Sequence, residues 1–127
     1  MDVTHPSQAH SAYRQIAAPT RTLRGIEHEV MARITHRLKA ASAHGASDFP
    51  ELVAALHENR QLWSTFAIAV ADPMNPLPQE LRARIFFLAE FTLTHTGKVL
   101  SEAADAAPLI DINTSVMRGL REQGPTA

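Results

Sequence analysis

Apolar residues recur along this chain at steps of three and four residues, and that period constrains its fold more than any other feature. It is clearest between about residues 22 and 42, where the apolar positions are Leu23, Ile26, Val30, Ile34, Leu38 and Ala41. Because an α-helix turns once every 3.6 residues, such a series lies along one face of an amphipathic helix. No segment shows the alternation of apolar and polar residues that is typical of a half-buried strand. The sequence therefore predicts an all-α protein.

Three further helical segments follow, separated by residues that end helices. We expect a second long helix over about 48–71, with a proline in its first turn. Residues 72–78 carry three prolines and form a rigid connector, because proline cannot continue a helix or pair within a sheet. A third helix over about 78–103 and a final one over about 108–123 complete the pattern. The prediction is a small antiparallel bundle of three long helices and a shorter C-terminal helix.

Length and composition indicate one domain. A chain of 127 residues with 45% apolar content can bury a sizeable core. We take residues 1–127 as a single helical domain in which residues 1–19 form a flexible or partly helical arm. Within that arm, Tyr13 and Ile16 fall on one side of a short helical stretch, which Pro19 ends.

The charge balance and the absent residue types argue against several functions. Twelve basic and thirteen acidic residues give a formal net charge of -1, which provides no strong footprint for nucleic acid or an anionic membrane. The chain has no cysteine, so disulfides and thiolate metal sites are excluded. The polar N-terminus lacks the apolar stretch of a secretory signal, and no apolar run is long enough to span a bilayer. We expect a cytoplasmic protein that does not bind membranes.

No pattern of polar residues predicts catalysis, a metal or a cofactor. The pair His28-Glu29 resembles the start of a zinc-protease motif, but the second histidine would have to stand where Ala32 is. His36 lies about two helical turns from His28, which is too far to share one ion. Carboxylates are dispersed, and no glycine-rich phosphate loop is present. We therefore expect a protein that is not an enzyme.

Basic residues on two predicted helices raise the alternative of an RNA-binding surface: Arg33, Arg37, Lys39, Arg82 and Arg84. Aromatic residues are not interleaved with them, and acidic residues share the same helices. Solvated helix faces are therefore the favoured interpretation.

The segment from Asn59 to Phe66 surrounds the only tryptophan with groups that form hydrogen bonds. In a helix, Leu62 and Phe66 share one face and Trp63 lies beside them. Arg60 precedes Trp63 by about one turn, which allows its guanidinium to lie along the indole ring. We predict that Trp63 is mostly buried.

Two polar residues, Asp111 and Asn113, interrupt an apolar run near the start of the last helix. Buried polar groups need hydrogen-bond partners, and Asn59 and Arg60 beside the tryptophan are suitable ones. We predict that Asp111 and Asn113 contact Asn59 and Arg60, which joins two helices. The alternative for Asp111 is that it only stabilises the positive end of its own helix.

Three segments together resemble the FlaF family of flagellar biosynthesis regulators from alphaproteobacteria. They are Asn-Arg-Gln-Leu-Trp-Ser-Thr-Phe at 59–66, Leu-Pro-Gln-Glu-Leu-Arg-Ala at 77–83 with His-Thr-Gly-Lys-Val-Leu at 95–100, and Pro-Leu-Ile-Asp-Ile-Asn at 108–113 leading to Val-Met-Arg-Gly-Leu. Their order and spacing carry the resemblance, which covers nearly the whole chain and is stronger after about Leu52. Phe91 stands where some relatives carry a second tryptophan.

The resemblance implies a cytoplasmic protein needed for flagellin synthesis and secretion. Such proteins look like flagellin-binding, chaperone-type adaptors that act alongside a translational regulator of flagellin. An alternative is a post-transcriptional regulator that contacts RNA or that regulator protein. For a flagellin site we expect Leu62, Leu88 and Ile112 to line an apolar groove beside the tryptophan helix. The alternative is that all three are plain core residues.

Overall fold

The computed structural model describes residues 26–43 and 48–123, and within them the chain forms four helices and no strand. The all-α prediction is confirmed, and the second, third and fourth helices lie within about two residues of where the sequence places them. The arm at residues 1–19 and the start of the first predicted helix lie outside the described residues. The helices are α2 (Ile26–Ala43), α3 (Phe49–Ala71), α4 (Gln79–Glu102) and α5 (Ala107–Gln123).

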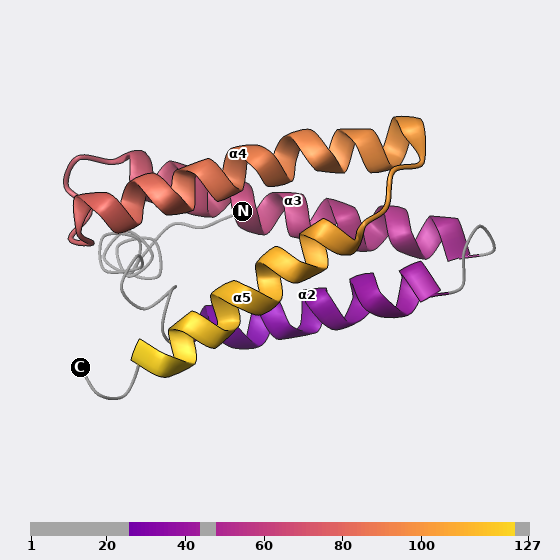
Figure 1. The fold of residues 1–127 in the computed structure, drawn as a ribbon, viewed down its shortest axis with the longest axis horizontal. Coiled ribbons are helices and arrows are strands. Elements are labelled where there is room, and N and C mark those ends of the chain that lie inside the picture. The colour runs from indigo at the N-terminus through magenta and orange to yellow at the C-terminus, as the bar shows by residue number, and fades with distance from the viewer. Residues whose placement is uncertain (1–25, 44–47, 124–127) are drawn as a thin grey trace, which may run out of the picture.

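The helices form an elongated bundle in which consecutive helices run in opposite directions (Figure 1). α3 packs along both α2 and α4. α5 starts beside the end of α4 and then crosses diagonally toward the start of α2, against which it mainly packs. α4 and α5 therefore diverge with distance from the turn that joins them.

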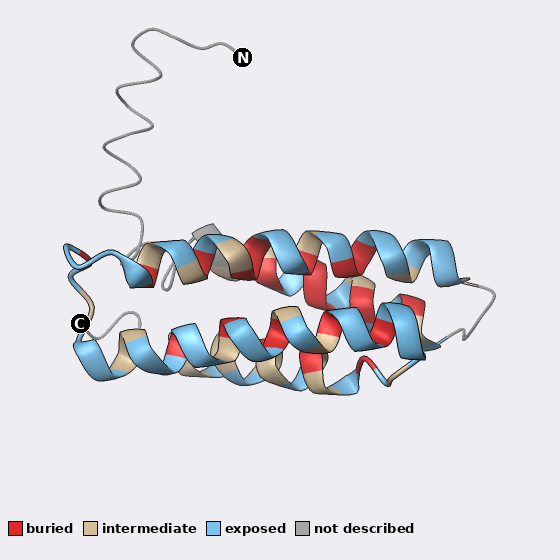
Figure 2. Ribbon diagram, turned by 90° about the horizontal axis from the view of Figure 1, so that it is seen from above, coloured by how far each residue is buried: buried red, intermediate tan, exposed pale blue. Residues whose placement is uncertain are grey.

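The core lies where the inner faces of the helices meet, as the buried positions in Figure 2 show. α3 supplies its largest side chains, including Leu56, Trp63 and Phe66. α4 instead buries mainly small ones, among them Ala89 and Thr96, neither of which is exposed at all. Small side chains allow the axis of α4 to approach α3 closely, which explains the long contact between these two helices.

The sequence predicts one buried stripe on α4, made of Leu81, Ile85, Leu88, Thr92, His95 and Val99, with Phe87 and Phe91 beside it. Ile85, Thr92 and Val99 are buried as predicted, but Leu81, Leu88 and His95 are only half-buried. Phe87 and Phe91 face outward, with 67% and 39% of their surface exposed. The period of the helix was therefore correct, but the buried face is rotated toward its smaller residues.

The connector between α3 and α4 is held by hydrogen bonds as well as by its prolines. Asn75 is buried, and its Nδ2 donates to the carbonyl oxygen of Ala69 at 2.8 Å while its Oδ1 accepts from the Leu77 amide at 2.9 Å. Arg82 donates to the carbonyl oxygen of Asp72 at 3.1 Å, which satisfies a group at the end of α3. Arg82 therefore stabilises a helix end and is not available as a free basic side chain.

No described helix is long and apolar enough to cross a membrane.

α4 ends in a strained residue. Ala103 has φ 57° and ψ 31°, the left-handed conformation that usually belongs to glycine at this position. The Cβ of alanine makes that conformation unfavourable by about 1 kcal/mol.

We expect Ala103→Gly to raise the free energy of unfolding by about 0.5–1 kcal/mol, because it removes this strain. The matched control is Ala83→Gly on the exposed side of the same helix, which should lower stability by about 1 kcal/mol. Urea unfolding followed by circular dichroism measures both. Equal losses in the two variants would contradict a left-handed Ala103.

Candidate functional site

Trp63 lies at the centre of the bundle with none of its surface exposed, which confirms the predicted burial. Its ring meets that of Phe66 edge to face, with centroids 5.1 Å apart and an interplanar angle of 83°. Its indole Nε1–H donates to Oδ1 of Asn113 on α5 at 2.9 Å. This hydrogen bond satisfies the one polar atom of the side chain, so it offsets the cost of removing the indole N–H from water.

Asn113 extends this hydrogen bond to two more side chains. Its Nδ2 donates to Oδ1 of Asn59 at 2.8 Å and to Oγ1 of Thr35 at 3.1 Å. The Thr35 hydroxyl in turn donates to the carbonyl oxygen of Met31 at 2.7 Å. We call the buried set Thr35, Asn59, Trp63 and Asn113 the polar core. It joins α2, α3 and α5 through side chains that are at most 4% exposed.

The predicted link between the two polar motifs is thus confirmed for Asn113 and Asn59 and wrong for Asp111 and Arg60. Both charged residues are exposed, and no hydrogen bond or ion pair joins them in the described part of the chain. The reason is helical geometry. Asp111 stands two residues from Asn113, about 200° around the helix, so it faces solvent when Asn113 faces inward. Arg60 likewise lies about 100° from Asn59.

The polar core leaves one donor unused. Nδ2 of Asn59 has no hydrogen-bond partner among the described residues although Asn59 is fully buried, and Oγ1 of the buried Thr92 on α4 also has none. Unpaired buried groups cost stability. The network is therefore retained at some energetic cost, which suits a role in fixing how the helices align.

The three residues expected to line a flagellin groove do not share one environment. Leu62 is 7% exposed and packs in the core, in agreement with the alternative that it is a plain core residue. Leu88 on α4 and Ile112 on α5 are half-buried and pack at the edge of the core. They stand on the two helices that diverge, so both remain candidates for contact with a partner.

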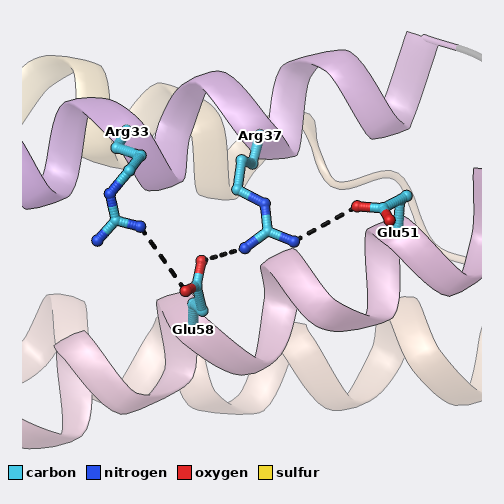
Figure 3. A network of polar contacts seen from close by, with 4 residues as sticks. All are labelled: Arg33, Arg37, Glu51 and Glu58. Carbon is cyan, nitrogen blue, oxygen red and sulfur yellow. Dashed lines mark hydrogen bonds and ion pairs between the residues drawn. The ribbon is translucent and has the colours of Figure 1, made fainter.

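A cluster of charges joins α2 to α3 on the surface (Figure 3). Arg37 lies between Glu58 and Glu51, with Nη2 at 3.4 Å from Oε1 of Glu51 and Nη1 bonded to Glu58. Arg33 reaches the other oxygen of Glu58 at 3.7 Å. The sequence pattern predicted solvated arginines here, and their ion-pair partners were not predicted. Arg33 and Arg37 are four residues apart, and two glutamates on the next helix are seven residues apart. This matched spacing of opposite charges could have indicated the ion pairs.

α4 carries three exposed phenylalanine side chains. Phe86, Phe87 and Phe91 are 37%, 67% and 39% exposed. The ring of Phe91 stacks on His95 with centroids 5.5 Å apart, and Nε2 of His95 lies 2.7 Å from the carbonyl oxygen of Asp105. Exposed phenylalanines on one helix make its outward face a candidate contact surface.

Comparison with protein families gives a match to flagellar protein FlaF over residues 9–120. The chain belongs to the FlaF family. The match includes the polar core, the charge cluster and the exposed face of α4. No match was found among curated proteins or among solved structures.

Metal binding has no candidate residues in the described part of this FlaF protein. No three histidine, aspartate or glutamate side chains at 26–43 and 48–123 lie close enough together to hold an ion.

We expect Asn113→Ala to lower the free energy of unfolding of this FlaF protein by about 3 kcal/mol. The substitution leaves Nε1 of Trp63 and Oδ1 of Asn59 buried without partners. The control is Asp111→Ala on the exposed side of the same helix, which should change stability by at most about 0.5 kcal/mol. Urea unfolding followed by Trp63 fluorescence provides the measurement.

A double-mutant cycle on the same pair checks the mechanism. Trp63→Phe removes the indole donor, so its cost and that of Asn113→Ala should couple by about 1 kcal/mol or more. Fully additive effects would show that the two side chains do not depend on each other.

We expect Glu58→Gln to lower stability by about 0.5–1 kcal/mol at low salt and by less at high salt, because it removes the shared partner of Arg33 and Arg37. Glu90→Gln serves as the control, since Glu90 is exposed on α4 and forms no ion pair with a described residue. Urea is the suitable denaturant because it leaves ionic strength unchanged. A loss that is equally large at high salt would rule out an electrostatic origin.

Proposed function

We propose that this protein binds flagellin in the cytoplasm as a chaperone-type adaptor, and that flagellin synthesis and secretion need it. Membership of the FlaF family supports the flagellar context. One observation carries the binding role: Leu88 and Ile112 are apolar, half-buried and located on two helices that diverge. Each of these side chains becomes fully buried when another apolar segment packs over it.

The properties of a flagellin helix suit binding at Leu88 and Ile112. The ends of flagellin are amphipathic helices that are unstructured before assembly, and such helices bind by laying an apolar face between the helices of a partner. Ordering the client on binding costs free energy, so the affinity is moderate and the complex reversible. Reversibility suits a carrier that releases flagellin for export. The proposal involves no catalytic turnover and no cofactor.

The alternative, a post-transcriptional regulator that contacts RNA, receives less support. RNA binding depends on unpaired lysine and arginine side chains that neutralise phosphates. Three of the arginines considered for this purpose already form ion pairs or hydrogen bonds with other groups of the protein: Arg33, Arg37 and Arg82. A contact with the translational regulator protein would instead use an apolar surface, as flagellin binding would. Binding assays with each of the two purified proteins distinguish these partners.

We expect purified flagellin to bind the wild-type protein in calorimetry, and Leu88→Gln with Ile112→Gln to weaken that binding at least about tenfold. Ile68→Gln on α3 is the matched control, because Ile68 is 75% exposed and should not affect binding. Trp63 variants are unsuitable for this test, since the fully buried ring reports on folding.

The ionic strength of the assay adds a second readout. Flagellin binding through Leu88 and Ile112 should change little with salt, whereas RNA binding would fall steeply. The absence of a heat change with folded wild-type protein and flagellin would refute a direct adaptor.

A further inference from the structure

The outward face of α4 carries a row of exposed residues at alternating steps of four and three. We call this row the α4 seam, and its members are Glu80, Arg84, Phe87, Phe91, Thr94 and Lys98. The spacing is the one with which two helices pack side by side in a coiled coil. All six residues are exposed, and the stacking of Phe91 on His95 is a contact within α4 itself, so no other described helix covers the seam.

The seam is symmetric about the midpoint between its two phenylalanines. Glu80 stands seven residues before Phe87, and Lys98 stands seven residues after Phe91. Reversing the direction of the seam therefore exchanges the two aromatic positions with each other and the acidic end with the basic end. A surface with this property is complementary to itself.

We propose that the α4 seam binds the α4 seam of a second copy of this chain, with the two helices antiparallel. Phe87 then packs against Phe91 of the second copy, and Glu80 faces Lys98 of the second copy. A twofold axis repeats each contact, so two such aromatic pairs and two ion pairs form. Arg84 falls opposite Thr94, where it meets no like charge.

The charges decide the direction of the pair. A parallel arrangement sets Glu80 against Glu80 and Lys98 against Lys98, which are repulsive contacts. The side chains of Glu80 and Lys98 form no ion pair with a described residue of their own chain, so pairing across the dimer breaks no existing interaction.

In this dimer, burial of the two phenylalanines at the centre of the α4 seam supplies the binding energy. The charged residues at its ends determine that the two helices are antiparallel. Phe87 is the more exposed of the two rings, at 67% against 39% for Phe91, and both lose contact with water in the dimer. One helix pair buries less surface than a permanent dimer does. The structure therefore assigns a weak dimer, with a dissociation constant of about micromolar or higher. The α4 seam is separate from the proposed flagellin contacts at Leu88 and Ile112.

Sedimentation velocity of the full chain over a wide concentration range tests the proposal, with circular dichroism to confirm that each variant is folded. Wild-type protein should form a dimer as its concentration rises. Phe87→Ser with Phe91→Ser should leave it monomeric throughout. Ile68→Ser on α3, another exposed apolar residue, should leave the dimer unchanged.

Charge exchange tests the register directly. Glu80→Lys and Lys98→Glu should each weaken the dimer about tenfold, because each places like charges in contact twice. The two substitutions together should restore the dissociation constant to within about threefold of wild type.

Three results would overturn the proposal: a monomer at every concentration, a dimer that survives loss of both phenylalanines, or a double exchange no better than the single ones. Flagellin binding is measured on the same variants. If the phenylalanine variant lost flagellin and wild type stayed monomeric, the seam would belong to a client helix and the self-association would be disproved. A dimer in a protein that does not bind flagellin would disprove the proposed function alone.

Discussion

The hydrogen bond between Trp63 and Asn113 is the interaction on which the rest of the bundle depends. It fixes the orientation of the Asn113 amide, because the oxygen must accept from the indole and the nitrogen must then donate to Asn59 and Thr35. Together these contacts restrict the placement of α5 relative to α2 and α3. Apolar packing alone tolerates small shifts between helices, whereas a buried network of directional bonds does not. The polar core thus sets the register of α2, α3 and α5.

Among the four described helices, α4 alone contributes no side chain to the polar core. It packs on α3 through small residues such as Ala89 and Thr96, which leaves Phe87 and Phe91 exposed. The protein thus combines three helices joined by buried hydrogen bonds with a fourth helix that exposes apolar side chains among charged ones. In this FlaF-family protein, the polar core preserves the fold, and the proposed contacts with flagellin and with a second copy use residues outside that set.

The helices could be predicted from the sequence because the 3.6-residue period and the prolines both indicate them. The contact of Asn113 with Asn59 was also predictable, since Asn113 interrupts an apolar run and Asn59 lies one helical turn before the buried tryptophan. The exposure of Asp111 and Arg60 was not predictable, because polarity alone does not determine which side of a helix a residue occupies. The exposure of Phe87 was missed for a related reason. Hydrophobicity favours burial of phenylalanine, but the close approach of α3 and α4 requires small residues at their interface.

The sequence separation between Asn113 and its partners has a consequence for folding during synthesis. Asn59 and Thr35 precede it by 54 and 78 residues. While the ribosome produces the chain, α2, α3 and α4 can already associate, but the indole of Trp63 lacks its acceptor until α5 emerges. α5 therefore completes the polar core after the other three helices have been made, and chains that stop before α5 retain an unsatisfied interior that quality-control proteases can recognise.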